Sequence, residues 1–249
     1  MHTSYTVIIT TFNRNLLLQR SLKSVLDQSL QPKEIIIINN HNKDIKKKFK
    51  SKKIKYYNLI KNFGSANGRN IGASLAKGKF LAYLDDDDFW HKDYLKHFVK
   101  INYDKDYDLI LTNTNCIKKN QKNKIFHIDH RDFNVEKIGL YNPGIRSSAT
   151  IVKRKSFLKV NGYDLKLYYG SADKDFLVKI IKNKMKIKII KRVLVNYLLH
   201  ENSHSRNSFL MLKSVIEYYK KHNHQINLIN KIRYFKKIIY LYYLNLICD

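Results

Sequence analysis

An apolar run leads directly into four consecutive aspartates: Phe80-Leu81-Ala82-Tyr83-Leu84-Asp85-Asp86-Asp87-Asp88. A short continuous apolar run is typical of a strand that is buried on both faces of a parallel sheet. The carboxyl ends of such strands are where α/β proteins bind their ligands. Four adjacent carboxylates repel one another, so a fold that holds them together has to supply a cation or hydrogen-bond donors. The segment therefore predicts an α/β fold with a ligand site at the end of a buried strand.

The ligand favoured by these aspartates is a divalent metal ion. Hard oxygen ligands at a strand end suit Mg²⁺ or Mn²⁺ that bridges to substrate phosphates, with one or two carboxylates touching the ion. The alternative is a solvated turn that caps the next helix, because aspartate is common at helix N-caps. The chain has only 20 acidic residues among 249, and four of them meet here. This concentration favours the metal.

Strand and helix patterns alternate on both sides of the aspartates. We expect strands at residues 5–10, 35–38, 54–57, 80–84 and 109–111, and helices at 16–26, 66–76 and 94–101. Repeated βα units imply a mostly parallel central sheet flanked by helices, with right-handed crossovers. The pattern over residues 1–115 resembles that of nucleotide-binding folds, which indicates a fold class and not yet a function.

The pattern loosens after residue 115. A strand at 148–152, a helix at 173–181 and strands at 187–190 and 193–198 predict a second half, 116–205, built onto the same sheet. Residues 206–249 are expected to form a basic, amphipathic helical tail. Its apolar residues recur in steps of four and three, which places them in one stripe along a helix: Leu228, Ile232, Phe235, Ile239, Tyr242 and Leu246.

Composition limits the possible classes of protein. Lys and Arg number 48, so the formal net charge is +28, and hydrophobic residues make up 44% of the chain, enough for a core. Cys116 and Cys248 supply no disulfide framework, the N-terminus resembles no signal peptide, and no apolar run reaches the length of a membrane span. We expect a cytoplasmic protein whose partners are anionic: nucleic acid, a lipid surface or phosphorylated small molecules.

The aspartates end a longer motif that starts at Asn62. With x for any residue, positions 62–90 read N-x-G-x-x-x-G-R-N-x-G-x-x-x-A-x-G-x-F-L-A-Y-L-D-D-D-D-x-W. Further motifs are T-x-N-R at 11–14, G-Y-D at 162–164, A-D-K-D-F at 172–176 and Y-x-x-H-x-x-S-x-S at 197–205. Together they resemble the family 2 glycosyltransferases, which are inverting, nucleotide-sugar-dependent enzymes with a GT-A fold. The resemblance covers residues 5–205 and leaves the tail outside. It implies a catalytic domain over residues 1–205, with a nucleotide-binding half at 1–115 and an acceptor-binding half at 116–205.

The resemblance implies a catalytic base. An inverting transfer is a single displacement, so a carboxylate must take the proton of the acceptor hydroxyl as the anomeric carbon is attacked. Asp173 occupies the family position of that base, and Asp175 is the second choice. A plain helix N-terminus would also favour these acids. Ala172 stands where the family often has Glu, which puts acceptor placement in doubt more than the chemistry.

The resemblance also implies a donor site and its metal. The D-x-D motif maps to residues 85–87, so Asp87, Asp85 and His200 are the expected ligands of Mn²⁺ or Mg²⁺. The metal would assist the departure of the nucleoside diphosphate. Ordinary helix-surface or structural roles remain the alternative for Arg69, Asn70 and His200. The residues expected at the nucleotide sugar are Thr10, Phe12, Arg14, Asn40, Arg69, Asn70, Asp85 and Asp86.

One departure leaves the base of the donor open. The family usually has an acid after the second strand, where it accepts the N3 proton of uracil, whereas this chain has Asn39-Asn40 followed by His41-Asn42-Lys43-Asp44. An Asn carbonyl can accept the same proton, and its amide can also serve cytosine. A UDP-sugar is the leading donor, and CMP- or CDP-linked donors stay open.

The expected acceptor is a hydroxyl of a glycan or lipid-linked glycan in surface polysaccharide synthesis. Candidate acceptor residues are Trp90, Ser147, Ser148 and Asp175, although Trp90 serves a core equally well. The basic, aromatic tail suits an anionic membrane at its cytoplasmic face, or packing on the domain or on a partner subunit.

Two other functions compete with the transferase. The charge and the 18 Tyr residues fit nucleic-acid binding, but no aromatic platform or recognition-helix motif supports it, so no nucleic-acid partner is expected. Asn39, Asn40 and Ala172 also fit a degenerate, nucleotide-binding partner subunit. The intact aspartate run and Asp173 argue against that alternative.

Overall fold

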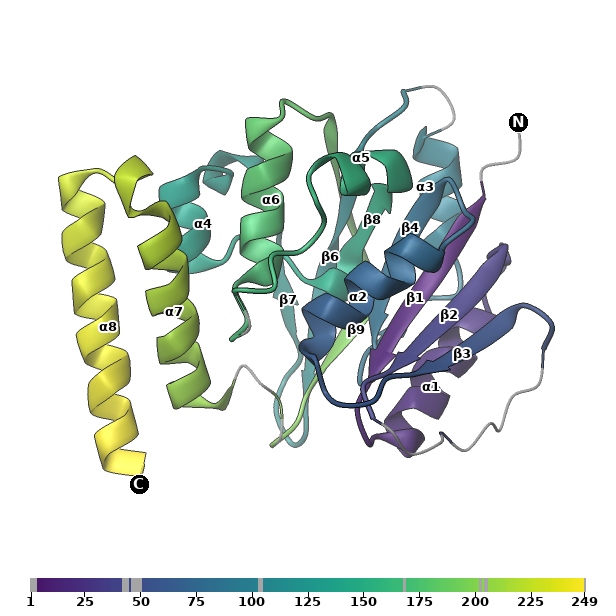
Figure 1. The fold of residues 1–249 in the computed structure, drawn as a ribbon, viewed down its shortest axis with the longest axis horizontal. Coiled ribbons are helices and arrows are strands. Elements are labelled where there is room, and N and C mark those ends of the chain that lie inside the picture. Colours follow the sequence, from purple (N-terminus) through teal and green to yellow (C-terminus); the bar gives the residue numbers. More distant parts are fainter. Residues whose placement is uncertain are drawn as a thin grey trace.

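A computed structural model describes residues 4–41, 45, 51–102, 105–167, 169–201, 203 and 206–248. Across these residues a nine-stranded sheet forms the centre, with helices on both of its faces and two long helices at one end (Figure 1). Parts of two predicted motifs lie outside the described residues: Asn42, Lys43 and Asp44 after the second strand, and Asn202, His204 and Ser205 in the late motif.

The first half is the predicted parallel βα arrangement. Its strands are ordered β3 (Ile54–Asn58), β2 (Glu34–Asn39), β1 (Tyr5–Thr11) and β4 (Phe80–Asp85), all parallel. Side chains alternate across each strand, so Ile36 and Ile38 pack toward α2 (Gly64–Leu75), whereas Ile35 and Ile37 pack toward α1 (Asn15–Leu26). The four isoleucines are fully buried, which explains why the strand is a continuous apolar run.

The second half extends the sheet in the order β4, β8 (Thr150–Lys153), β6 (Leu109–Lys118), β9 (Ile187–Leu199) and β5 (Phe89–Trp90). β8 is antiparallel to both of its neighbours, and β6 runs parallel to β9. The remaining elements are α3 (Tyr94–Asn102), β7 (Lys124–Phe126), a 3₁₀ turn (His130–Asp132), α4 (Val135–Tyr141), a second 3₁₀ turn (Ser147–Ala149), α5 (Arg154–Lys159) and α6 (Ala172–Lys182). The whole is an α/β arrangement of a central sheet flanked by helices, as predicted.

The strands predicted at 187–190 and 193–198 are one strand, β9, with a register shift opposite residues 112–114. The polar pair Lys191-Arg192 that breaks the apolar pattern sits at this irregularity. Side chains of β6 satisfy its carbonyl groups: Thr112 Oγ1 donates to Arg192 O, and Asn113 Nδ2 donates to Lys191 O at 2.7 Å. The exposed polar pair is therefore a bulge in a continuous strand.

The C-terminal segment forms α7 (Ser208–His222), a 3₁₀ turn (Asn223–Gln225) and α8 (Leu228–Cys248), which lie side by side next to α4 (Figure 1). Tyr218 and Tyr234 are fully buried and join the core of the second half. Gly139 of α4 allows this packing, because a Cβ there would lie 1.8 Å from the Tyr234 hydroxyl. The division at residue 205 stays a prediction, since the core spans it.

The apolar stripe predicted along α8 is largely exposed, although Phe235 makes a ring contact with Tyr219 of α7 at 5.6 Å between centroids. Leu228, Ile232, Phe235, Ile239 and Tyr242 are all exposed. A second row, Tyr234, Ile238 and Leu241, faces the core instead. Lys231 and Lys237 flank that inner row, and Lys237 Nζ donates to Leu140 O, so the inner face does not stand out in the sequence. None of the described helices combines the length and the apolar composition needed to cross a membrane.

Candidate active site

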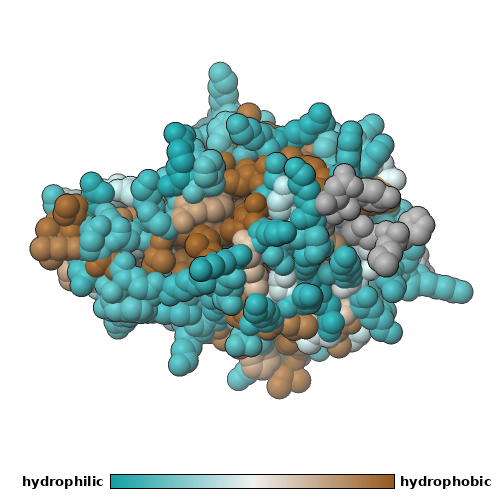
Figure 2. Space-filling view, turned by 90° about the horizontal axis from the view of Figure 1, so that it is seen from above, coloured by the Kyte–Doolittle hydropathy of each residue, from teal (hydrophilic) through white to brown (hydrophobic). Residues whose placement is uncertain are grey.

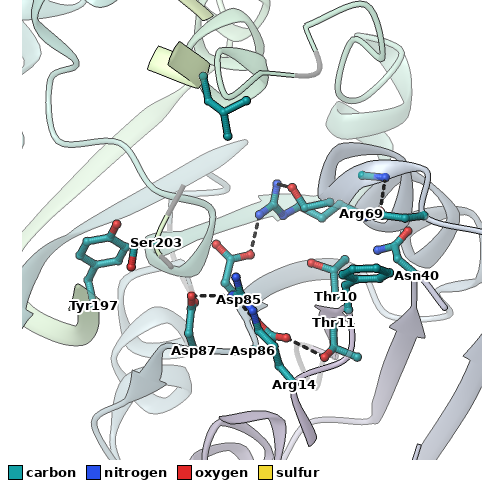
Figure 3. Close-up of a pocket in the computed structure, with 15 residues that line it drawn as sticks. Thr10, Thr11, Arg14, Asn40, Arg69, Asp85, Asp86, Asp87, Tyr197 and Ser203 are labelled. Carbon is teal, nitrogen blue, oxygen red and sulfur yellow. Dashed lines mark hydrogen bonds and ion pairs between the residues drawn. The ribbon is translucent and has the colours of Figure 1, made fainter. Parts of the chain in front are cut away.

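A cavity of about 480 Å³ lies where β1, β2 and β4 end (Figure 3). This position, at the carboxyl ends of parallel strands, is the predicted one. Residues expected at a donor that line it are Thr10, Phe12, Arg14, Asn40, Arg69, Asp85 and Asp86, together with Asp87. The structure therefore brings these predicted residues together at one cavity, and the geometry below shows the contacts of each side chain.

Side chains of α1 hold the backbone of the turn that carries the aspartates. Ser21 Oγ lies within hydrogen-bond distance of the carbonyl oxygens of Asp85, Asp86 and Asp88, and Arg20 donates to Asp87 O. The backbone N–H of Asp85 donates to Ser148 Oγ at 3.0 Å. The turn is thus held through its backbone, which leaves the carboxylates to face other partners.

Asp87 meets two cationic or ionisable groups at the pocket. Its Oδ2 lies 3.0 Å from Arg14 Nη1 and 3.1 Å from His200 Nε2. Arg14 follows β1 and His200 follows β9, so two distant segments converge on this one carboxylate. The predicted proximity of His200 to the acidic motif is therefore present in the structure.

Asp85 faces the opposite side of the pocket. Arg69 reaches from α2 and donates to Asp85 Oδ1 at 2.5 Å (Figure 3). Burial opposes the charge on Arg69, but Asp85, Tyr163 and Asp173 together raise the pKa of the guanidinium, so it stays charged. Arg69 is thus a fixed cation between the motif and Asp173.

Asp86 and Asp88 are the two buried members of the run. Asp86 accepts a hydrogen bond of 2.6 Å from Thr11 Oγ1, and burial raises the pKa of Asp86 to about 6. Asp88 accepts from the backbone N–H of Leu198 at 3.1 Å, and burial raises the pKa of its carboxyl well above the usual range. These two contacts tie the turn to β1 and β9.

Asp173 lies in the first turn of α6 and is not among the residues that line the cavity. It interacts electrostatically with Arg69 and Asp85, and burial raises the pKa of its carboxyl. The loop before α6 is fastened to α2 by Asn70, whose Nδ2 donates to Tyr163 O at 2.8 Å and whose Oδ1 accepts from Tyr163 N at 2.9 Å. Asn70 thus holds this loop and does not line the cavity.

Asp175 points away from Asp173. It is fully buried, with Oδ1 at 3.0 Å from His222 Nε2 and 2.7 Å from Lys221 Nζ, both on α7. Burial opposes ionisation, but His222 and Lys221 lower the pKa of Asp175 below its usual value. The structure therefore places Asp175 in a contact between α6 and the tail, not beside the cavity.

The other acceptor candidates are buried. Trp90 stacks on Tyr94 with ring centroids 4.1 Å apart, and its Nε1 donates to Ser148 O at 2.8 Å. Ser147 and Ser148 are also buried, and neither lines the cavity. Trp90 thus has the core position that its sequence context allowed.

The two asparagines at the end of β2 have different contacts. Asn39 Nδ2 donates to Asn58 Oδ1 at 3.0 Å, which ties β2 to β3. Asn40 lines the cavity, and its Oδ1 is buried with no hydrogen-bond partner among the described residues. A buried polar atom without a hydrogen-bond partner lowers the stability of the fold. Asn40 Oδ1 is therefore a candidate to accept a hydrogen bond from a bound ligand. Gly68 permits this arrangement, since a Cβ there would meet Asn40 at 3.2 Å.

Asp87 and His200 have the chemistry of a metal site. Among the described residues, no three His, Cys, Asp or Glu side chains are gathered as ligands, because Asp85 is turned to Arg69. A carboxylate and an imidazole in contact nevertheless suit Mn²⁺ or Mg²⁺ when substrate phosphates supply further oxygens. The donor set therefore fits a metal ion that is held jointly with a phosphorylated ligand.

Several cavity residues were not among the predicted site residues: Thr11, Asn62, Gly64, Ser65, Tyr197, Ser203 and Leu210. All but Leu210 belong to the motifs at 11–14, 62–90 and 197–205, so the motifs themselves were the signal. Leu210 belongs to α7, in the segment placed outside the resemblance. Its position gives the tail a part in the wall of the cavity, and nothing in the sequence pattern indicated it.

Lys174, next to Asp173, gives a pH-dependent prediction. Burial, with Lys237 nearby, lowers the pKa of Lys174 to about 8. The unfolded pKa is about 10.4, so between pH 8 and 10 the unfolded state binds more protons and stability rises with pH. Lys174→Met is expected to add about 1–3 kcal/mol at pH 7, and the gain shrinks toward pH 10.

Urea unfolding at both pH values measures the effect of Lys174→Met. The exposed Lys182 on the same helix provides the control, because Lys182→Met is expected to change stability by less than about 0.5 kcal/mol. A loss of stability in Lys174→Met at pH 7, or a gain that is unchanged at pH 10, contradicts the prediction.

Comparison with known proteins yields two family matches. The model of "Glycosyl transferase family 2" matches residues 6–163, and the model described as "N-terminal domain of galactosyltransferase" matches residues 123–204. An uncharacterized glycosyltransferase of Rickettsia conorii is 28% identical over 202 residues, which are 75% of this chain and 33% of the relative. The chain thus spans about a third of the length of that relative.

A Staphylococcus aureus relative matches nearly the whole chain. The poly(ribitol-phosphate) beta-N-acetylglucosaminyltransferase TarP is 25% identical over 254 residues, with 95% of this chain and 70% of TarP covered. Among solved structures, S. aureus TarS 1–349 in complex with UDP-GlcNAc superposes with a TM-score of 0.64 at 16% identity. That match covers 93% of this chain and 78% of the TarS chain, and at this identity it speaks for the fold alone.

Proposed function

This chain belongs to the glycosyl transferase family 2, and from that membership we propose that it moves a sugar from a nucleotide-sugar donor to a hydroxyl of a glycan or lipid-linked glycan acceptor. The observation that carries the proposal is the ion pair of Arg69 and Asp85 in the cavity at the strand ends, with Asp173 near enough to interact electrostatically with both. A cation, a D-x-D acid and a nearby half-buried carboxyl match the requirements of a displacement at an anomeric carbon.

The proposed donor is a UDP-sugar. Asn40 Oδ1, buried without a partner, would accept the N3 proton of uracil. The name of the relative TarP, an N-acetylglucosaminyltransferase, supports N-acetylglucosamine as the first sugar to test on such a donor. An amide can also rotate to serve cytosine, so CDP and CMP donors are the alternatives that the experiment below separates.

Asp173 is the proposed base. Its carboxylate takes the proton of the acceptor hydroxyl while the acceptor oxygen bonds to the anomeric carbon and the bond to the diphosphate breaks, with inversion. Arg14 and Arg69 both line the cavity, and their positive charge would stabilise the negative charge that develops on the leaving diphosphate. Asp87 and His200 are the proposed metal ligands, and a divalent ion there would neutralise the same group.

The proposed setting is cytoplasmic, where nucleotide sugars would be at hand for the synthesis of a surface glycan. A relative from Campylobacter jejuni, 36% identical over 90 residues, is a GalNAc(5)-diNAcBac-PP-undecaprenol beta-1,3-glucosyltransferase; the match covers 33% of this chain and 29% of that protein. Its name supports a lipid-linked acceptor as one candidate here.

A thermal-shift screen tests the donor and metal together. UDP, GDP, dTDP, CDP and CMP are each added with Mn²⁺ or with EDTA, and UDP-GlcNAc is included as a full donor. A ligand at 100 times its Kd stabilises by about 2.7 kcal/mol, or roughly 5–10 °C for a chain of this size. We expect UDP with Mn²⁺ to give the largest shift, and EDTA or Asp87→Asn to remove most of it.

Two results would count against this proposal. Equal, small shifts for all nucleotides would argue against a nucleotide site in the cavity. A clear UDP shift without release of UDP from UDP-GlcNAc, in the presence of Mn²⁺ and glycan acceptors, would favour the non-catalytic partner subunit. The exposed pair Lys23–Asp27 offers a control, since Asp27→Asn lies outside the cavity and should bind UDP like the native chain.

A further inference from the structure

Helix α8 has two apolar faces, and the chain covers only one of them. The inner row, Tyr234, Ile238 and Leu241, packs toward the core. The outer row consists of large side chains that are 50–74% exposed: Leu228, Ile232, Phe235, Ile239 and Tyr242. Figure 2 shows hydrophobic side chains at the end of the molecule that α8 forms. A continuous exposed apolar row on a helix marks an interaction surface.

Basic side chains border the outer row on both sides. At 100° per residue, Lys231 falls on one side of the row and Lys236 on the other, and the exposed Arg233 lies one step further. The sequence of α8 contains no Asp or Glu. Lysines in these positions can lay their methylene stems along the apolar row and keep their charges outward.

This charge pattern decides between two occupants of the outer row. Pairing with a second copy of α8 would bring like charges together, with no acid on either helix to offset them. An anionic lipid surface offers the complementary charge over the whole row and also accepts the apolar side chains. We propose that α8 docks in the plane of an anionic phospholipid bilayer through its outer row.

The end of α8 is linked through α7 to the wall of the cavity. Ser208 Oγ, at the start of α7, donates to Asn245 Oδ1 near the end of α8 at 2.5 Å. Two residues further along α7, Leu210 lines the cavity. Docking of α8 would thus bring the rim of the cavity toward the lipid, where a lipid-linked acceptor would stand if the proposed function holds. The docking itself does not depend on catalysis.

Vesicle co-sedimentation tests the docking. The full chain is mixed with vesicles of phosphatidylcholine alone or with 30 mol% phosphatidylglycerol. We expect binding to the anionic vesicles to be at least tenfold stronger. The variant Lys231→Gln/Lys236→Gln should lose about 25-fold, since each basic residue contributes a factor of about five near such a surface. Leu228→Ser/Ile232→Ser/Ile239→Ser should lose at least tenfold in binding, while its unfolding temperature stays equal to that of the native protein.

The control is an exposed leucine elsewhere: Leu165→Ser should bind like the native chain. Native protein that stays in the supernatant with anionic vesicles would overturn the proposal, as would an equal loss in Leu165→Ser. Light scattering after size-exclusion chromatography tests whether a second copy of the chain binds the outer row. A native dimer that the triple serine variant converts to a monomer would assign the outer row to a second copy instead.

Discussion

Asp173→Asn is expected to lower kcat for sugar transfer by a factor of about 10²–10⁴, the usual contribution of a general base. The change keeps the size of the side chain but removes the atom that would accept the proton. The KM for the donor should stay within about threefold, because the proposed donor contacts come from other residues. Steady-state transfer from UDP-GlcNAc to a glycan acceptor, with both substrates varied, separates the two effects.

The pH profile gives a second readout for Asp173. A base must be ionised to act, and burial raises the pKa of Asp173 above its ordinary value near 3.9. Activity of the native enzyme should therefore fall on the acid side at a pH above that value, and the fall should be absent from the residual activity of Asp173→Asn. Asp132→Asn, on an exposed 3₁₀ turn, is the matched control and should leave kcat unchanged.

Full transfer activity in Asp173→Asn would remove Asp173 from the mechanism. A loss confined to KM would also contradict the assignment, since it would indicate a binding role. A native chain that binds UDP without any turnover would instead remove the enzymatic proposal itself, which is why donor binding is measured first.

The parallel half of the fold was predictable because strands that are buried on both faces of a parallel sheet have unbroken apolar runs in their sequence. The run at residues 35–38 is fully buried, and the run at 80–84 ends in the acids that line the cavity. Short elements have no comparable pattern in the sequence. β5, β7, α4 and α5 were not predicted, since two to seven residues carry too little periodicity to stand out.

Which side of an element a residue faces was harder to predict than the element itself. Asp173 and Asp175 are two positions apart on α6, about 200° around the helix, so only one of them can face Arg69. Sequence spacing gives that angle but not the side on which the cavity lies. The same holds for Asn39, which bonds to Asn58 of β3, and for Asn40, which lines the cavity. It also holds for α8, whose exposed outer row has the more regular apolar spacing.

Asp175→Asn is expected to cost about 3 kcal/mol of folding stability, because removing one partner of a buried ion pair leaves the others uncompensated. Asp175 is fully buried and contacts Lys221, His222 and, at 3.5 Å, Lys179. Urea unfolding at pH 7 measures the loss. The exposed pair Lys23–Asp27 provides the control, since Asp27→Asn should cost less than about 1 kcal/mol.

The sign of the pH dependence follows from the lowered pKa of Asp175. A carboxyl with a depressed folded pKa contributes stability above its unfolded pKa, near 3.9, and loses it as the pH falls through the folded value. The difference between the native chain and Asp175→Asn should therefore be constant from pH 7 to about 5 and shrink below pH 4. A difference that stays constant at acid pH would show that packing, and not charge, accounts for the loss.

The same variant separates the two carboxylates of α6. If Asp175 only joins α6 to α7, the folded Asp175→Asn protein should keep kcat within about threefold of native at low temperature, while Asp173→Asn has lost it. The loss of stability in the double variant Asp175→Asn/His222→Gln should be smaller than the sum of the losses in the two single variants, because both changes remove the same contact. A folded Asp175→Asn protein without activity, beside an active Asp173→Asn, would reverse the assignment of the base.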